Sequence, residues 1–132
     1  MGEFLRVLGA FAILMFFFFT ITFLMNYFAP LCPREGVELK LPFTKFGTGV
    51  AYQAAAPSLE QFSDTSAAPT RSNYLVCENG YVLGPAHSVH AEIIAKGKGR
   101  FSHWTATGFV FSASDNSDPN TNGRNYWAVA GK

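Results

Sequence analysis

The sequence lacks an excess of charge of either sign. Ten Lys and Arg residues nearly balance nine Asp and Glu residues, and the net charge is +1. A protein that binds nucleic acid through its phosphates carries a broad basic surface, so we expect no nucleic-acid partner. Internal repeats are also lacking, and 132 residues leave room for one small domain beyond any targeting segment.

Charged side chains are absent from residues 7–28, VLGAFAILMFFFFTITFLMNYF. At about 1.5 Å rise per residue this run extends roughly 33 Å as a helix, enough to cross the core of a bilayer. The hydroxyl groups of Thr20 and Thr22 can bond back to their own helix. A signal peptide is the alternative, but its apolar segment is usually about 7–15 residues long, and FAPLC has no A-x-A-like cleavage site. We therefore expect residues 1–30 to be an uncleaved, single-pass transmembrane anchor.

Neither charge nor cysteine decides on which side of the membrane the rest of the chain lies. Arg34, Lys40 and Lys45 outnumber Arg6 and the terminal amine and favour a cytoplasmic C-terminal domain, whereas a short amino tail more often stays inside. The chain has only two cysteines, Cys32 and Cys77. A bridge between them requires a domain near the bilayer that faces an oxidising compartment. We interpret them as two unpaired thiols.

Three stretches follow the anchor. Residues 31–53 alternate apolar and polar side chains, interrupted by proline and glycine, and predict a short strand or an extended arm close to the membrane surface. Residues 54–72, AAAPSLEQFSDTSAAPTRS, have the composition of a linker, with Leu59 and Phe62 as apolar anchors. Residues 73–132 form the compact, β-rich part.

Within that compact part we expect the order β-β-α-β-β-β. The dipeptide Asn79-Gly80 supplies the positive φ angles of a tight hairpin. Residues 85–96 predict a helix of two to three turns that starts at Pro85 and has Gly97 just after its end. RFSHWTATGFVFSAS predicts two further strands, and NYWAVA a last one. The expected fold class is a single N-terminal transmembrane helix plus a small α+β domain, one antiparallel sheet with one short helix.

Three segments, ENGYVLGPAHSVHAEI, GKGRFSHW and FSASDNSDPNTNGRNY, resemble a short bacterial module. That module occurs beside enzymes that modify sugars and polysaccharides, and as a separate piece in membrane-anchored proteins. The resemblance covers roughly residues 75–127. It implies a bacterial envelope protein, hence the inner membrane, and a module that is reused where glycans are handled. It supplies no catalytic residues.

The histidines are candidate ligands for a transition metal. His87 and His90 lie three residues apart on the predicted helix, a spacing that can bind one ion, and His103 could supply a third nitrogen. We prefer the simpler interpretation that one histidine caps the helix and another packs beside Trp104. Ser88 lies between two histidines, but helical neighbours point about 100° apart, and the chain has no G-x-S-x-G motif. We therefore expect no enzyme.

The loop SASDNSDPNTNGRNYW, residues 112–127, is rich in Asp and Asn. Residues 118–123 match the first half of a calcium loop, D-x-N-x-N-G, but Val129 occupies the twelfth position, where a bidentate Glu is expected. The alternatives are a recognition loop and plain turn chemistry, in which side chains satisfy neighbouring backbone amides. We prefer turn chemistry and expect no cofactor. The candidate calcium ligands are Asp115, Asp118, Asn120 and Asn122.

Aromatic and basic residues near the end of the chain form a candidate surface for a sugar or a protein partner. They are His103, Trp104, Arg124, Tyr126 and Trp127. We predict a non-catalytic accessory subunit of a larger bacterial membrane complex, whose Phe-rich helix packs in the bilayer against its partner. The alternative is a membrane-tethered glycan-binding module, and a small envelope enzyme comes third.

Overall fold

The computed structural model describes residues 2–27, 32 and 35–132. The chain divides into two compact units, Met1–Pro30 and Leu31–Lys132. The predicted boundary between the anchor and the arm, at residues 30 and 31, lies outside the described residues.

The first unit is one helix, α1 (Gly2–Tyr27), of 26 residues. The Thr20 hydroxyl donates to the carbonyl of Phe16 at 2.9 Å, and Thr22 bonds back in the same way, as the sequence predicts. The large apolar side chains described between Phe11 and Ile21 are exposed. Among the parts of the chain that the structure describes, no helix has the length and hydropathy needed to cross a membrane.

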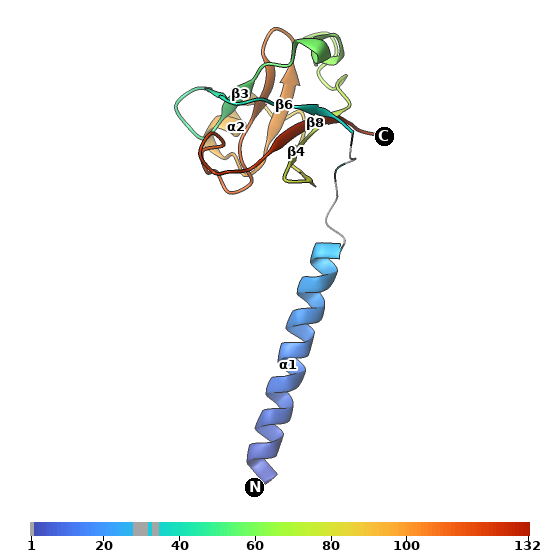
Figure 1. Ribbon diagram of the computed structural model, residues 1–132, viewed down its shortest axis with the longest axis vertical. Coiled ribbons are helices and arrows are strands. Elements are labelled where there is room, and N and C mark those ends of the chain that lie inside the picture. Colours follow the sequence, from blue (N-terminus) through green and yellow to red (C-terminus); the bar gives the residue numbers. More distant parts are fainter. Residues whose placement is uncertain (1, 28–31, 33–34) are drawn as a thin grey trace. The chain divides into compact units, whose positions relative to one another are not determined.

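The second unit is a small α+β domain, which confirms that part of the expected fold class (Figure 1). It has two four-stranded antiparallel sheets where we expected one. The strands of the first sheet, in order, are β1 (Val37–Glu38), β8 (Tyr126–Ala130), β4 (Tyr74–Glu78) and β5 (Tyr81–Val82). Those of the second are β2 (Thr44–Lys45), β3 (Tyr52–Ala54), β7 (Gly108–Phe111) and β6 (Phe101–Trp104).

The main core lies between the sheets, because strand residues two apart point to the same face. From β7, Phe109 and Phe111 are fully buried, and Phe111 packs against Tyr126 of β8 with ring centroids 5.0 Å apart. The other face of β7 presents Val110 to a second, smaller cluster that includes Ile93 of helix α2 (His90–Ala95). The second sheet is therefore covered on both faces.

The stretches expected to be an arm and a linker belong to the folded domain. Residues 37–54 supply three strands: β1 pairs with β8, β2 pairs with β3, and β3 pairs with β7. Residues 57–62 form a 3-10 helix, η1 (Pro57–Phe62), whose Leu59 is buried. The linker prediction is wrong because small side chains such as Ala54 fill the core without producing an apolar pattern.

Helix α2 is shorter than predicted. It starts at His90, not at Pro85, because His87 has a φ of 52° and so cannot continue a right-handed helix. Its end agrees with the prediction, since Gly97 has a φ of 58° and donates to the carbonyl of Glu92. The Asn79-Gly80 hairpin also forms as predicted, with φ angles of 49° and 86°.

Cys32 and Cys77 form a disulfide, with their Cα atoms 6.2 Å apart. The interpretation as two unpaired thiols is wrong. Cys77 lies in β4, and the backbone N–H of Cys32 donates to the carbonyl of Gly80 in the next turn. The bond therefore ties the first part of the domain to its first sheet.

Candidate functional site

A pocket of about 400 Å³ lies beside α2 and β6. That volume is at the lower end of the range of about 300–1,000 Å³ typical of small-molecule sites. Its lining consists of Asp64, Pro69, His87, Ser88, Val89, His90, Ser102 and Trp104.

Strand β6 divides its side chains between the core and this pocket. Ser102 and Trp104 line the pocket, whereas Phe101 and His103 point to the opposite face, toward the first sheet. The face of β6 that lines the pocket therefore carries a hydroxyl and an indole. The alternation of side chains along RFSHW predicts which residues share a face, once it is known which face points to the core.

Asp64 is a fully buried carboxylate that joins three segments. Its backbone N–H donates to the carbonyl of His103 at 2.8 Å, which extends the edge of β6 by one bridge. Its Oδ1 accepts from the backbone N–H of Ser72 at 2.7 Å, and its Oδ2 lies 2.6 Å from Nδ1 of His87. Burying a carboxylate is costly unless it is paired and hydrogen-bonded, and Asp64 is both.

His87 reaches Asp64 from a left-handed backbone conformation, with a φ of 52°. That conformation is uncommon outside glycine and costs on the order of 1–2 kcal/mol. Its side chain is 30% exposed while that of Asp64 is 1% exposed. With Nδ1 held by the carboxylate, Nε2 is the nitrogen that remains to contact a ligand.

Two buried polar atoms of the pocket have no hydrogen-bond partner among the described residues. They are Oγ of Ser102, a residue only 3% exposed, and Nε2 of His90. The imidazole of His90 packs edge-on between Phe46 and Trp104, with ring centroids 5.0 and 6.5 Å away. Burial lowers the pKa of His90 below its ordinary value, so the ring is neutral near pH 7. A buried polar group without a partner is destabilising, which makes these two atoms natural contacts for a ligand.

His103 belongs to the core, and its assignment to a binding surface is wrong. It is 2% exposed, stacks on Phe109 at 4.1 Å between centroids, and has Nδ1 2.8 Å from the hydroxyl of Ser72. Burial lowers its pKa, although the Asp64 carboxylate acts in the opposite direction. His103 is inward because it alternates with Trp104 on β6.

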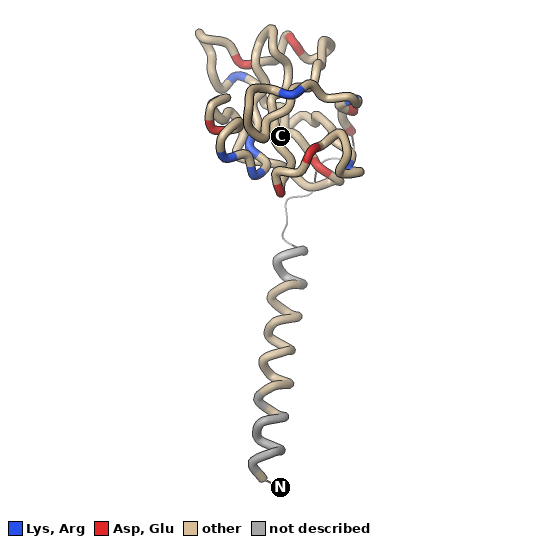
Figure 2. Tube along the Cα trace, turned by 90° about the vertical axis from the view of Figure 1, so that its left-hand side faces the viewer, with Lys and Arg blue, Asp and Glu red and all other residues tan. Residues whose placement is uncertain are grey.

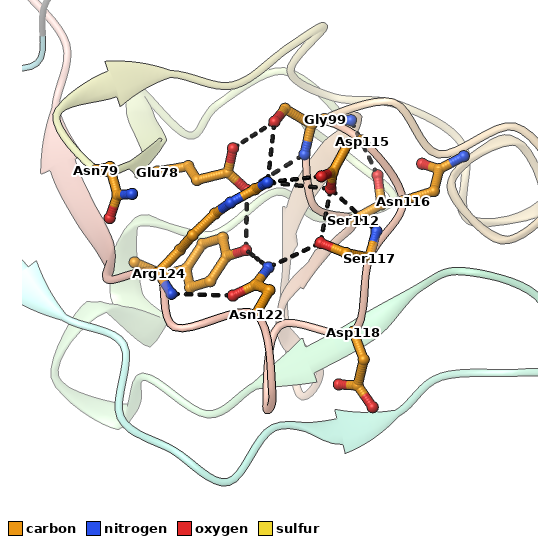
Figure 3. A network of polar contacts seen from close by, with 12 residues as sticks. Glu78, Asn79, Gly99, Ser112, Asp115, Asn116, Ser117, Asp118, Asn122 and Arg124 are labelled. Atoms are coloured by element: carbon orange, nitrogen blue, oxygen red, sulfur yellow. Dashed lines mark hydrogen bonds and ion pairs between the residues drawn. The ribbon is translucent and has the colours of Figure 1, made fainter.

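The Asp/Asn-rich loop is organised around Arg124 (Figure 3). Its guanidinium donates to both carboxylate oxygens of Asp115, at 3.0 and 2.6 Å, and to Glu78 at 3.2 Å. These hydrogen bonds hold the pKa of Asp115 well below its ordinary value. Glu78 is buried and also accepts from the hydroxyls of Tyr126 and Ser114. Burial, followed by the Glu78 contact, raises the pKa of Tyr126 well above its ordinary value.

The four candidate calcium ligands do not converge. Asp115 is engaged by Arg124, and Figure 3 shows Asp118 pointing away from that network. The carboxylate of Asp118 accepts from the backbone N–H of Asn120 at 2.9 Å. The Asn120 amide exchanges two hydrogen bonds with the backbone of Phe43, and Asn122 donates to the Tyr126 hydroxyl. The contacts are those that turn chemistry requires.

Metal-binding groups are not found in the described part of the chain, where no three His, Cys, Asp or Glu residues are suitably grouped. The histidine triplet fails because His103 faces the core while His87 and His90 line the pocket. The packing of one histidine beside Trp104, by contrast, is found at His90.

The predicted aromatic and basic surface is divided among separate places. Trp104 lines the pocket, Arg124 is held in the loop, and Tyr126 is buried. Trp127 is 38% exposed on β8, in the first sheet, whereas Trp104 is in the second. Of the five residues, Trp104 lines the pocket of about 400 Å³, whereas Arg124 and Tyr126 border a smaller one of about 200 Å³.

Sequence reasoning missed Asp64, Pro69 and Ser102. Asp64 and Pro69 lie in the stretch that was interpreted as a linker, where nothing local marks a buried carboxylate. Ser102 had a usable signal, because it is two residues before Trp104 on a predicted strand and shares its face.

The pocket therefore combines an oriented acid–histidine pair, two polar atoms that have no partner among the described residues, and one indole. Such a set can bind a ligand that offers both hydroxyl groups and an apolar face. Comparison of the chain with protein-family models, with curated proteins and with solved structures finds no match.

Proposed function

We propose that this protein is a membrane-tethered, non-catalytic glycan-binding module, and that the pocket beside Trp104 is its binding site. The observation that carries the proposal is the presence of unpartnered Ser102 and His90 atoms next to an indole in one pocket. Sugars offer hydroxyl groups to such atoms and a C–H face to such a ring. The resemblance to a module found in glycan contexts supports the same class of ligand.

The tether is supported by the run of residues 7–28, which has no charged side chain. In α1, side chains such as Leu14 and Phe16 are 69% and 68% exposed, and lipid or another helix would cover them favourably. The membrane in question, by the same resemblance, is the inner membrane of a bacterium.

The disulfide supports placing the domain on the oxidising side of that membrane. Disulfides persist in the periplasm and are rare in the cytosol. The test is thiol alkylation of membranes without reduction, followed by mass measurement. Cys32 and Cys77 should both resist labelling until a reductant is added, and labelling of either beforehand would place the domain in the cytosol.

The Asp64–His87 pair favours a small hydrolase as the second candidate. A carboxylate that orients an imidazole is one part of a nucleophilic triad. The nucleophile of such a triad is missing among the described residues, since the hydroxyl of Ser88 donates to the carbonyl of Pro85 and that of Ser102 makes no bond to His87. Turnover of an ester or glycoside that depends on His87 would establish the enzyme and refute the binding module.

The expectation of an accessory subunit depends on α1 and stays a prediction. It requires that a larger membrane protein co-purify with the full chain at a fixed stoichiometry after gentle extraction. A stable partner would be compatible with glycan binding, because the pocket belongs to the other unit of the chain.

The experiment that tests the proposed function is a glycan array probed with the full chain in micelles of a detergent without a sugar headgroup. We expect binding to some glycans, loss of that binding in Trp104→Ala, and retention in Trp127→Ala. The two tryptophans are the only ones in the chain, and Trp127 lies outside the pocket, so it is the matched control. Equal binding by both variants would show that the pocket is not the site, and no binding at all would refute the proposal.

A further inference from the structure

The charge of the pocket limits what it can bind. None of the described residues that line it is Lys or Arg, and its buried charge is the Asp64 carboxylate. The nearby guanidinium of Arg71 is engaged by the backbone carbonyls of Ser63 and Gln61. Along the trace of the domain, positions of Lys and Arg are interspersed with positions of Asp and Glu (Figure 2). A second anion in this pocket would face Asp64 where water screens the repulsion poorly.

The hydrogen-bonding groups of the pocket suit hydroxyl groups. A hydroxyl both donates and accepts, and so does the Oγ of Ser102 that lacks a described partner. Each carboxylate oxygen of Asp64 accepts one hydrogen bond in the structure and has capacity for another. A neutral His90 presents Nε2 as either donor or acceptor, according to its tautomer.

The shape adds an apolar platform. Trp104 contributes its indole, and Val89, 66% exposed, lies at the edge of the pocket. A volume of about 400 Å³ suits a small ligand or the end of a chain better than the middle of an extended polymer.

From these observations we infer that the pocket binds an uncharged sugar residue, at the end of a glycan, and discriminates against acidic and phosphorylated sugars. The sugar ring lies on Trp104, and its hydroxyl groups bond to Ser102, His90 and Asp64. This inference rests on the proposed function and names the class of sugar that it recognises.

The experiment uses Trp104 as its own reporter. The full chain with Trp127→Phe, in micelles of a detergent without a sugar headgroup, retains Trp104 as its sole tryptophan. Its fluorescence is titrated with the methyl glycosides of glucose, galactose, mannose, rhamnose and N-acetylglucosamine, and with glucuronic acid and glucose 6-phosphate. We expect a saturable change with at least one neutral sugar, insensitive to salt, and affinities for both acidic sugars lower by about tenfold or more.

Conservative variants separate binding from folding. Ser102→Ala removes only Oγ and should weaken binding by about tenfold, while Ser58→Ala, on the exposed surface of η1, should leave it unchanged. Thermal melting confirms that both variants fold. Tighter binding of glucuronic acid or glucose 6-phosphate would overturn the neutral class while leaving glycan binding standing. No saturable change with any of the sugars would overturn this inference, and a positive array would then locate the site elsewhere.

Discussion

Asp64 connects parts of the chain that are far apart in sequence. Its carboxylate joins the loop before α2, through His87, to the segment before β4, through Ser72. The same residue extends β6 through its backbone. Because the Asp64 carboxylate bonds to two segments next to the pocket, we expect its removal to change the shape of the pocket and to lower the stability of the domain.

The buried histidines predict how stability depends on pH. His90 and His103 have pKa values below the ordinary 6.5 because burial disfavours their charged form. The unfolded chain therefore takes up protons below about pH 6.5 that the folded chain does not, and the free energy of unfolding should fall as the pH drops from about 7 to 5. Thermal melting across this range measures it.

A variant identifies the residue responsible. His90→Gln removes one titrating group and should make the free energy of unfolding depend less on pH between about 7 and 5. Asp115 acts at lower pH, because its pKa lies below the ordinary value of 3.8. A melting temperature that rises as the pH falls through this window would show that the histidines are not the controlling groups.

At the level of elements, the loop of residues 112–125 is a connection made rigid by its own polar side chains. Arg124, Asp115 and Glu78 fasten it to β4, and Asn120 fastens it to Phe43. The carboxylates of Asp115 and Asp118 in this loop already accept hydrogen bonds from the chain, and we therefore expect its conformation not to depend on an ion.

The loop should therefore be indifferent to calcium. Asp118→Ala removes the acceptor for the Asn120 amide and should cost about 0.5–2 kcal/mol of stability with or without the ion. Asp118→Asn keeps an acceptor at the same place and is the matched control, expected to be close to wild type. A calcium-dependent rise of several degrees in melting temperature, lost in Asp118→Asn, would instead demonstrate a cation site.

For the whole molecule, the proposed membrane anchor is the feature most open to direct test. Phe17→Arg places a charge in the middle of residues 7–28 and should cost roughly 2.5–3.5 kcal/mol of insertion, which depletes the membrane-bound pool. Phe17→Leu keeps an apolar side chain and should behave like wild type. Immunoblots of membrane and soluble fractions measure the membrane-bound share of each variant.

Intact-mass measurement on membranes gives a separate check on the anchor. It should find the full chain, less at most its first methionine. A mature species that begins near Ala29 or Cys32 would identify residues 1–30 as a cleaved signal peptide.

Several features of the fold follow from neighbouring residues and were predicted for that reason. The Asn79-Gly80 turn, the strands at 101–104, 108–111 and 126–130, and the end of α2 at Gly97 are all set by local conformational preference or by a short-range pattern. The expectation that the protein has no nucleic-acid partner depends on composition alone and stays a prediction.

The site was decided by the tertiary structure. Strands of two residues, such as β1 and β2, have no readable period, and they exist because longer strands offer them partners. Asp64 and His87 are 23 residues apart, and Cys32 and Cys77 are 45 apart, so only the packed chain brings each pair together. The sequence by itself thus determined the apolar run and the local turns and strands. Which side chains share the pocket depends on distant segments, whose pairing no local preference encodes.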